Sequence, residues 1–130
     1  MEGRLIIPRF NIEADISFLV DTGADSSLIG PADGFEMGLD YTAFGKITES
    51  VGTGGLAESY TEKASIAFTD PGKCMYVYHV DLEIAVPSDA IEEMPSLLGR
   101  EILDRWRMVY DPTKSDLSFI IRSADVTLPV

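Results

Sequence analysis

The stretch SFLVDTGADSSLI, residues 17–29, decides how the rest of the chain is interpreted. Apolar side chains alternate through Ile16, Phe18 and Val20, which predicts a strand, and the run ends abruptly in Asp-Thr-Gly at residues 21–23. Desolvating a carboxylate is costly unless partners hold it. An aspartate at the end of an apolar strand therefore either caps a turn or has a chemical role.

The composition of the chain is that of a globular protein. Its 130 residues are 45% hydrophobic, which predicts one domain, spanning residues 1–130, with one core. The net charge of −12 argues against binding to nucleic acid and to anionic membrane surfaces. Cys74 is the single cysteine, so no intramolecular disulfide is possible. The sequence shows no signal peptide and no membrane span, and we expect a soluble, cytoplasmic protein.

Turn residues interrupt the chain at short intervals, and the segments between them are rich in β-branched and aromatic residues. This pattern is typical of a mostly β domain. The sequence predicts strands over residues 4–12, 14–21, 27–29, 46–51, 56–69, 74–86, 107–111 and 116–121.

The connections between these strands are also predicted. GTGG at 52–55 and DPGK at 70–73 are hairpin turns by composition. Residues 30–45 contain several Gly and Pro residues and little periodicity, which predicts a loop with at most one helical turn. Residues 87–95 are expected to form a second loop. The only convincing helix lies within 96–106, where Ile102, Leu103 and Trp106 share one face.

Three separated segments carry the candidate chemistry. The first, FLVDTGADSS, puts the Asp21 carboxylate at a strand end, followed by a hydroxyl and a glycine. The second, SVGTGGLAE, is a glycine-rich hairpin tip that would suit a mobile lid. The third, SLLGREIL, puts Arg100 at a helix start, where a cation opposes the helix dipole. Arg100 is therefore expected to pair with an anion, and Asp25 is the candidate.

In this order and spacing, the three segments resemble the retropepsin-like aspartic proteases, the single-domain relatives of pepsin. The shared motifs are an apolar run into Asp-Thr-Gly-Ala-Asp, a glycine-rich flap about thirty residues later, and apolar-apolar-Gly-Arg opening a late helix. The resemblance covers residues 5–121. It implies a mostly β fold with a closed, barrel-like sheet, a flap hairpin and one short C-terminal helix.

The resemblance also implies a role for each matching residue. Asp21 would be the catalytic carboxylate. Thr22 would contact Thr22 of the second copy across an interface, and Gly23 would complete the catalytic triplet. Asp25 would form a structural ion pair with Arg100. The substrate-binding residues would be Gly23, Asp25, Gly52, Thr53, Gly54 and Gly55, with the last four at the flap tip. The implied activity is that of an aspartic endopeptidase acting on extended peptide or protein substrates.

This chemistry requires two carboxyl groups. One ionised carboxylate takes a proton from water while a neutral carboxylic acid protonates the carbonyl oxygen, and the two groups, roughly 3 Å apart, share one proton. The chain has one Asp-Thr-Gly and no second such triplet, and Asp33-Gly34 and residues 70–72 have the composition of turns. The second carboxylate must then come from another copy, in a two-fold homodimer. By the resemblance, the chain termini are expected to help close this dimer, although residues 122–130 depart most from the family.

Simpler interpretations stand beside these. Asp21 alone is compatible with a turn-capping aspartate, Asp25 with a solvated turn charge, and GTGG with an ordinary hairpin.

Other functional motifs are missing from the sequence. A phosphate-binding loop is disfavoured because no Gly-Lys-Ser/Thr follows GTGG, and an EF-hand is disfavoured because the calcium-ligand spacing is missing, so no metal or cofactor is expected. His79 is expected to be packed or solvated, with no nucleophile to pair with it. For the whole chain, the alternative functions are a catalytically weak scaffold for peptide binding or dimerisation, and a protease that acts only on its own precursor.

Overall fold

The structure is a computed structural model that describes residues 1–45, 47–52 and 55–130. Its helices and strands, in chain order, are β1 (Glu2–Ile7), the 3₁₀ helix η1 (Pro8–Phe10), β2 (Ile12–Ser17), β3 (Leu19–Val20), β4 (Leu28–Ile29), α1 (Pro31–Met37), η2 (Tyr41–Ala43), β5 (Ile47–Gly52), β6 (Gly55–Asp70), β7 (Cys74–Ala85), η3 (Asp89–Ile91), β8 (Leu97–Leu98), α2 (Arg100–Leu103), β9 (Trp106–Asp111), β10 (Asp116–Ile121) and β11 (Val126–Pro129).

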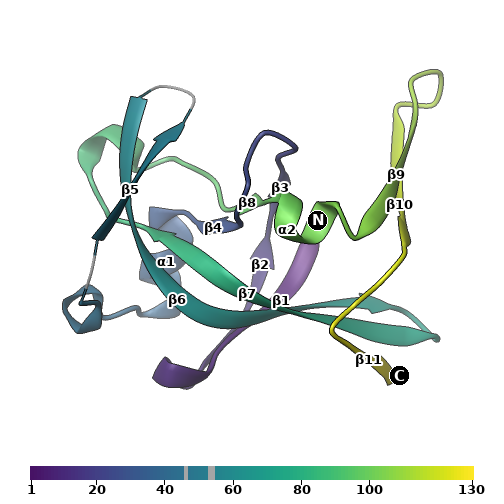
Figure 1. Ribbon diagram of the computed structural model, residues 1–130, viewed down its shortest axis with the longest axis horizontal. Helices are drawn as coiled ribbons and strands as arrows, with labels where there is room; N and C mark the ends of the chain where they lie inside the picture. The colour runs from purple at the N-terminus through teal and green to yellow at the C-terminus, as the bar shows by residue number, and fades with distance from the viewer. Residues whose placement is uncertain (46, 53–54) are drawn as a thin grey trace.

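One large sheet dominates the described part of the chain, as predicted for a mostly β protein. Its strand order is β2-β1-β6-β7-β4-β8-β3, with β5 paired to β6 and β11 paired to β7. The sheet curls into a half-barrel, and the long strands β6 and β7 run through its middle (Figure 1). Strands β9 and β10 form a separate two-stranded sheet that stands away from it. None of the described helices is long and apolar enough to cross a membrane.

The antiparallel strand pairs on either side of both predicted hairpin turns are present. Residues 71–73 connect β6 to β7, and Gly72 takes a φ of 76°, which only glycine adopts readily. Asp70 pairs with Cys74 across this turn, so the register of the whole β6–β7 ladder is set there. The β5–β6 hairpin ends at the pair Gly52 and Gly55.

The core lies in the concave side of the curled sheet and is closed by α2 and by the root of β9. Strands from across the whole sheet contribute to the core, because every second residue of each strand faces inward. The fully or nearly fully buried apolar side chains include Leu5, Ile7, Ile16, Phe18, Ile29, Ile66, Phe68, Tyr78, Leu82, Ile84, Leu98, Ile102 and Trp106.

The prediction of a loop with at most one helical turn over residues 30–45 was wrong. Pro31–Met37 forms the seven-residue helix α1, followed by the 3₁₀ helix η2. The Pro and Gly residues that suggested a loop mark the ends of the helix instead. Pro31 occupies the first turn, where its missing N–H costs nothing, and Gly38 ends the helix with a φ of 75°.

The helix predicted within residues 96–106 is present but much shorter, and it is not the only one. Leu97 and Leu98 form β8, α2 spans four residues, Arg100–Leu103, and Trp106 already begins β9. The predicted inward face is buried, yet Trp106 reaches the core from a strand. Helical spacing was misleading here, because a short helix followed by a turn brings the same residues to one side.

Candidate functional site

The strand that precedes Asp21 is fixed by its pairing with β8. Strand β3 runs parallel to β8, with Leu19 opposite Leu97 and Val20 opposite Leu98. The backbone N–H of Asp21 donates to the Leu98 carbonyl at 3.0 Å, which extends the ladder to Asp21 itself. Two of the predicted segments, the Asp-Thr-Gly strand and the Leu-Leu-Gly-Arg segment, are therefore neighbours in the sheet.

The Asp21 side chain is half-buried at the start of the loop that joins β3 to β4. Its Oδ1 accepts a hydrogen bond from the backbone N–H of Gly23 at 2.9 Å, and its carbonyl accepts from Ala24 N at 3.2 Å. Thr22 and Gly23 are exposed. The turn orients the carboxylate while leaving Oδ2 without a hydrogen-bond partner among the described residues, and Oδ2 is thus available to a ligand or a second carboxyl group.

The same loop is joined to α2 by main-chain and side-chain contacts. The carbonyls of Ala24 and Asp25 accept hydrogen bonds from the N–H groups of Arg100 and Glu101 at 2.8 and 3.2 Å. The Arg100 guanidinium forms an ion pair with the Asp25 carboxylate. Both side chains of this pair are largely exposed, so the pair contributes little to stability and serves to orient the loop on the helix.

Glu101 and Ser27 connect the loop after β3 to α2 and to Gly99, a role that was not predicted from the sequence. Glu101 Oε1 accepts from Ser27 N at 2.6 Å, and the buried Ser27 hydroxyl accepts from Gly99 N at 3.0 Å. A Cβ atom at Gly99 would lie 2.5 Å from the carbonyl carbon of Ser26, so only glycine allows the two segments to approach this closely. The sequence signal was the position of Glu101, directly after Gly-Arg and at the start of a helix.

Solved structures share this arrangement of strands and loops. The chain superposes on the crystal structure of a retropepsin-like aspartic protease from Rickettsia conorii with a TM-score of 0.58, over 92% of this chain and 88% of that one, at 19% identity. The fold is retropepsin-like. EIAV protease complexed with the inhibitor HBY-793 also matches, with a TM-score of 0.46 and 22% identity over 80% of this chain and 85% of that one. No family model and no curated protein sequence matches the chain.

The third predicted segment lies apart from the other two in this retropepsin-like fold. The β5–β6 hairpin rises on one flank of the molecule, whereas the loop after β3 lies beside α2 near the centre (Figure 1). Gly52 and Gly55 form the last pair of the hairpin, and Thr53 and Gly54 lie outside the described residues. Asp21, Asp25 and Arg100 are thus gathered at one loop, and the glycine-rich hairpin is not part of that cluster.

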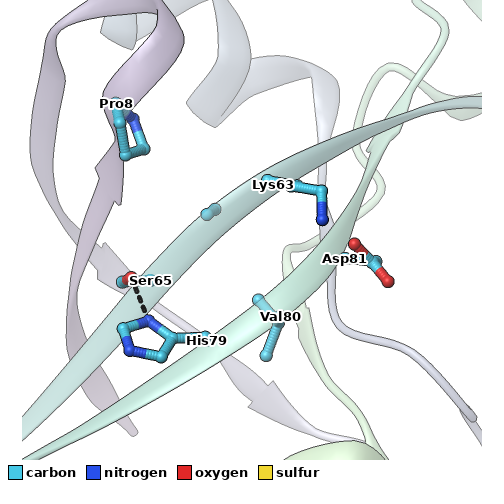
Figure 2. Close-up of a pocket in the computed structure, with 7 residues that line it drawn as sticks. Pro8, Lys63, Ser65, His79, Val80 and Asp81 are labelled. Carbon is cyan, nitrogen blue, oxygen red and sulfur yellow. Dashed lines mark hydrogen bonds between the residues drawn. The ribbon is translucent and has the colours of Figure 1, made fainter.

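A second polar cluster lies on the outer face of β6 and β7, around an open groove of about 510 Å³ (Figure 2). Ser65 Oγ and His79 Nδ1 lie 2.8 Å apart across the two strands, and Lys63 and Asp81 also line the groove. The expectation that His79 has no nucleophile beside it was therefore wrong. However, no described carboxylate bonds to the imidazole, because Asp125 accepts from the backbone N–H of His79, at 2.8 Å. A Ser-His-Asp triad is not formed here.

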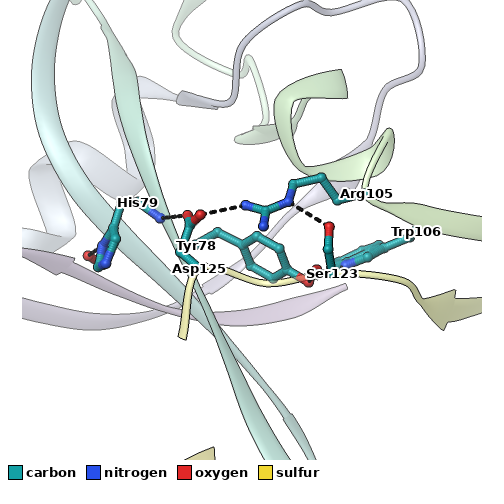
Figure 3. A network of polar contacts seen from close by, with 7 residues as sticks. Tyr78, His79, Arg105, Trp106, Ser123 and Asp125 are labelled. Carbon is teal, nitrogen blue, oxygen red and sulfur yellow. Dashed lines mark hydrogen bonds and ion pairs between the residues drawn. The ribbon is translucent and has the colours of Figure 1, made fainter. Parts of the chain in front are cut away.

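Asp125 belongs to a network that fastens the segment after β10 to the main sheet (Figure 3). Arg105 donates to Asp125 Oδ1 at 2.8 Å and to Ser123 Oγ at 2.9 Å. The Tyr78 hydroxyl donates to the Ser123 carbonyl and accepts from the Trp106 indole N–H, both at 2.7 Å. We call these five residues the C-terminal clasp. It holds residues 122–125 in the position from which β11 pairs with β7.

The clasp also affects the ionisation of its members. The hydrogen bond from the His79 backbone N–H, followed by that from Arg105, lowers the pKa of Asp125. Burial raises the pKa of Tyr78. Among the described residues, no group of three His, Cys, Asp or Glu side chains is placed to hold a metal ion.

Proposed function

We propose that the chain is an aspartic endopeptidase in which two copies each contribute Asp21. The observation that carries the proposal is the position of Asp21 in a retropepsin-like fold, at the end of β3, with its backbone bonded to β8 and Oδ2 left open. A carboxylate held by its own backbone in a half-buried position has a fixed direction and remains reachable by water and substrate.

The reaction would use the two carboxyl groups as a pair. With one shared proton, the ionised Asp21 removes a proton from a water molecule that attacks the peptide carbonyl, and the protonated Asp21 donates to the carbonyl oxygen. The resulting tetrahedral intermediate collapses when the proton is transferred to the leaving nitrogen. We expect cleavage to be best at mildly acidic pH, where the pair keeps one proton, because cleavage stops when both groups are ionised or both are neutral.

Residues near Asp21 would bind and position the peptide. The exposed Gly23 offers an unobstructed backbone carbonyl, and Thr22 would support its counterpart across the two-fold axis. Leu19, two residues before Asp21 in β3, exposes 57% of its surface and would contact an apolar substrate side chain or the second copy. The Asp25–Arg100 pair would hold the loop in place, and residues 52–55 would cover the peptide as a flap.

Asp21→Asn tests the proposal directly. The variant should lose peptide cleavage by at least a hundred-fold while its unfolding curve stays close to that of the unmodified chain, because the amide keeps the shape and the Gly23 contact but cannot act as a base. A peptide library digested at several pH values provides the measurement. Asp81→Asn is the matched control, since Asp81 faces outward from β7 and should not affect cleavage (Figure 2).

The same assay separates an enzyme from the scaffold alternative. Cleavage that persists in purified Asp21→Asn would contradict the proposed mechanism. Saturable peptide binding by the unmodified chain with no cleavage at any pH would favour a catalytically inactive peptide-binding protein.

A further inference from the structure

The β9–β10 hairpin has one face made entirely of apolar side chains. Residues paired directly across the two antiparallel strands project from the same face. On this face the three pairs are Trp106 with Ile121, Met108 with Phe119, and Tyr110 with Leu117. The opposite face is mixed, because it carries charged and hydroxyl residues besides Val109 and Ile120.

Burial decreases along this apolar face from the root of the hairpin to its tip. Trp106 is in the core, and Phe119 and Ile121 pack against it. Farther out, Met108, Leu117 and Tyr110 expose 41%, 43% and 65% of their surfaces. The face is therefore continuous with the core at one end and open to solvent at the other, which is the pattern of a surface that another molecule covers.

The two strands of this hairpin also lack further strand neighbours within the described chain. β9 pairs with β10 only, and the hairpin stands clear of the main sheet (Figure 1). A two-stranded hairpin is marginally stable in water unless another layer or strand supports it. The clasp supports the root through Trp106, but it does not reach Tyr110 or Leu117.

The charge of the hairpin indicates what covers it. The whole chain carries a net charge of −12, so two copies repel each other over most of their surfaces. Between residues 106 and 121, however, Arg107 and Lys114 balance Asp111 and Asp116. The hairpin thus combines exposed apolar surface with local neutrality, which suits contact with a second copy better than contact with a strongly charged partner.

We propose that the apolar face of the β9–β10 hairpin, at Met108, Tyr110 and Leu117, is the contact through which two copies of the chain associate. This inference rests on the proposed function, which requires a second copy to supply the other Asp21. The hairpin begins two residues after the C-cap of α2, and α2 holds the Asp21 loop through Arg100. Pairing of two hairpins about a two-fold axis would therefore also set the position of the two loops.

The proposal differs from an interface made by the chain termini. The strand nearest the C-terminus, β11, is paired with β7 of the same chain over residues 126–129, and the clasp fixes the segment before it. At the other end, β1 lies between β2 and β6. β1 thus has a neighbouring strand on each edge, whereas β11 has a described partner on one edge only, so a contact through β11 is the alternative that the experiment has to separate from the hairpin contact.

Tyr110→Arg tests the hairpin contact. Placing a charge in an apolar interface should raise the dimer dissociation constant, measured by sedimentation, by roughly ten-fold or more. Phe35→Arg is the matched control, because Phe35 on α1 is 62% exposed and should leave association unchanged. Leu128→Arg on β11 tests the competing location. Circular dichroism and unfolding curves establish that all three variants keep the fold.

Each outcome either supports the inference or overturns it. Selective dissociation of Tyr110→Arg supports it. Dissociation of Leu128→Arg with Tyr110→Arg still dimeric would assign the interface to the terminal strand and overturn it. An unmodified chain that stays monomeric at the highest soluble concentration would overturn it as well, and binding of a different protein to the hairpin would then become the explanation of the exposed face.

A mixing experiment separates failure of this inference from failure of the proposed function. Excess Asp21→Asn should inhibit the unmodified chain by drawing it into mixed dimers that hold a single Asp21 carboxyl group and are inactive, and Asp21→Asn combined with Tyr110→Arg should not. If association depends on Tyr110 but no preparation cleaves peptides, the hairpin contact stands and the protease proposal fails. If cleavage depends on Asp21 but excess Asp21→Asn combined with Tyr110→Arg still inhibits, the protease proposal stands and the hairpin contact fails.

Discussion

The β6–β7 and β9–β10 hairpins use similar residues in very different surroundings. Both have apolar faces and short polar turns, but β6–β7 is paired on its outer edges with β1, β5, β4 and β11. Its inward residues Ile66, Tyr78 and Leu82 are nearly or completely buried. By contrast, the β9–β10 hairpin has no described neighbouring strand and leaves Tyr110 and Ile120 more than half exposed.

The difference shows that an alternating apolar pattern marks a strand without saying which molecule covers it. In β6–β7 the cover comes from the same chain, and the hairpin contributes to the stability of the fold. In β9–β10 only the root is covered, and the outer half is the surface that we propose for association. Substitutions in the two hairpins should therefore affect different measurements.

Truncation of equivalent isoleucines should give the largest contrast. Ile66→Ala removes a completely buried side chain from β6 and should lower the free energy of unfolding by about 2–5 kcal/mol. Ile120→Ala removes a half-exposed side chain from the mixed face of β10 and should change it by less than about 0.5 kcal/mol. Urea denaturation of both variants measures the difference. Similar losses in the two variants would mean that β9–β10 is packed within the monomer.

A glycine substitution tests whether the candidate site belongs to the tightly packed part of the molecule. Gly99→Ala would bring a Cβ atom against the backbone of Ser26 and should cost about 1–3 kcal/mol through displacement of the Asp21 loop. Gly45→Ala is the control, because no heavy atom of the described residues lies within 4 Å of the added carbon. Thermal unfolding provides the measurement, and an unchanged midpoint for Gly99→Ala would contradict the close packing of loop and helix.

Many of the strands and turns could be predicted from the sequence, because they depend on local patterns of apolar and turn-forming residues. Alternation and turn composition predicted the long strands and the turn at 70–73, which are confirmed, and strands β5 and β6 pair up to Gly52 and Gly55 on either side of the predicted 52–55 turn. The apposition of the Asp-Thr-Gly and Leu-Leu-Gly-Arg segments followed from the family resemblance. The Ser65–His79 contact could also have been predicted, because counting residues back from the 70–73 turn along both strands puts these two opposite each other.

Other features depend on tertiary contacts that no local pattern reveals. The Pro and Gly residues of α1 were interpreted as loop signals, since composition does not distinguish a helix boundary from a turn. The anchoring of the loop by Glu101 and Ser27 requires two segments far apart in sequence to meet. The pairing of β11 with β7 follows a segment held by the clasp, whose members Arg105 and Asp125 are 20 residues apart. The catalytic assignment of Asp21 remains a prediction.

Tyr78 connects the two hairpins, and removing its hydroxyl should have an intermediate effect. Tyr78→Phe leaves the buried Trp106 N–H without its acceptor and the Ser123 carbonyl without its donor. The expected loss is roughly 1–2 kcal/mol in the free energy of unfolding. Faster hydrogen exchange at residues 122–129 than in the unmodified chain would show that the clasp has loosened. Unchanged exchange there would contradict a role for Tyr78 in holding this segment.

Asp125→Asn should give the smallest effect, and one that depends on pH. Because hydrogen bonds from the His79 backbone and Arg105 lower the pKa of Asp125 below its ordinary value of 3.8, the ionised carboxylate stabilises the folded state above pH 3.8. That contribution is lost as the pH falls through the lowered pKa, where the carboxylate of the folded chain becomes protonated. The variant should therefore be less stable by about 1 kcal/mol near neutral pH, with the gap closing in acid.

Urea denaturation across the pH range measures this gap, with Asp81→Asn as a control that lacks the two donors. A gap that stays constant from neutral pH to acid would mean that the amide disturbs the packing and that the charge of Asp125 contributes nothing. A gap that closes in acid would show that the clasp is an electrostatic connection between the main sheet and the segment following the β9–β10 hairpin. The two hairpins would then differ in the pH range over which their supporting contacts persist, since the apolar contacts around Ile66 do not titrate.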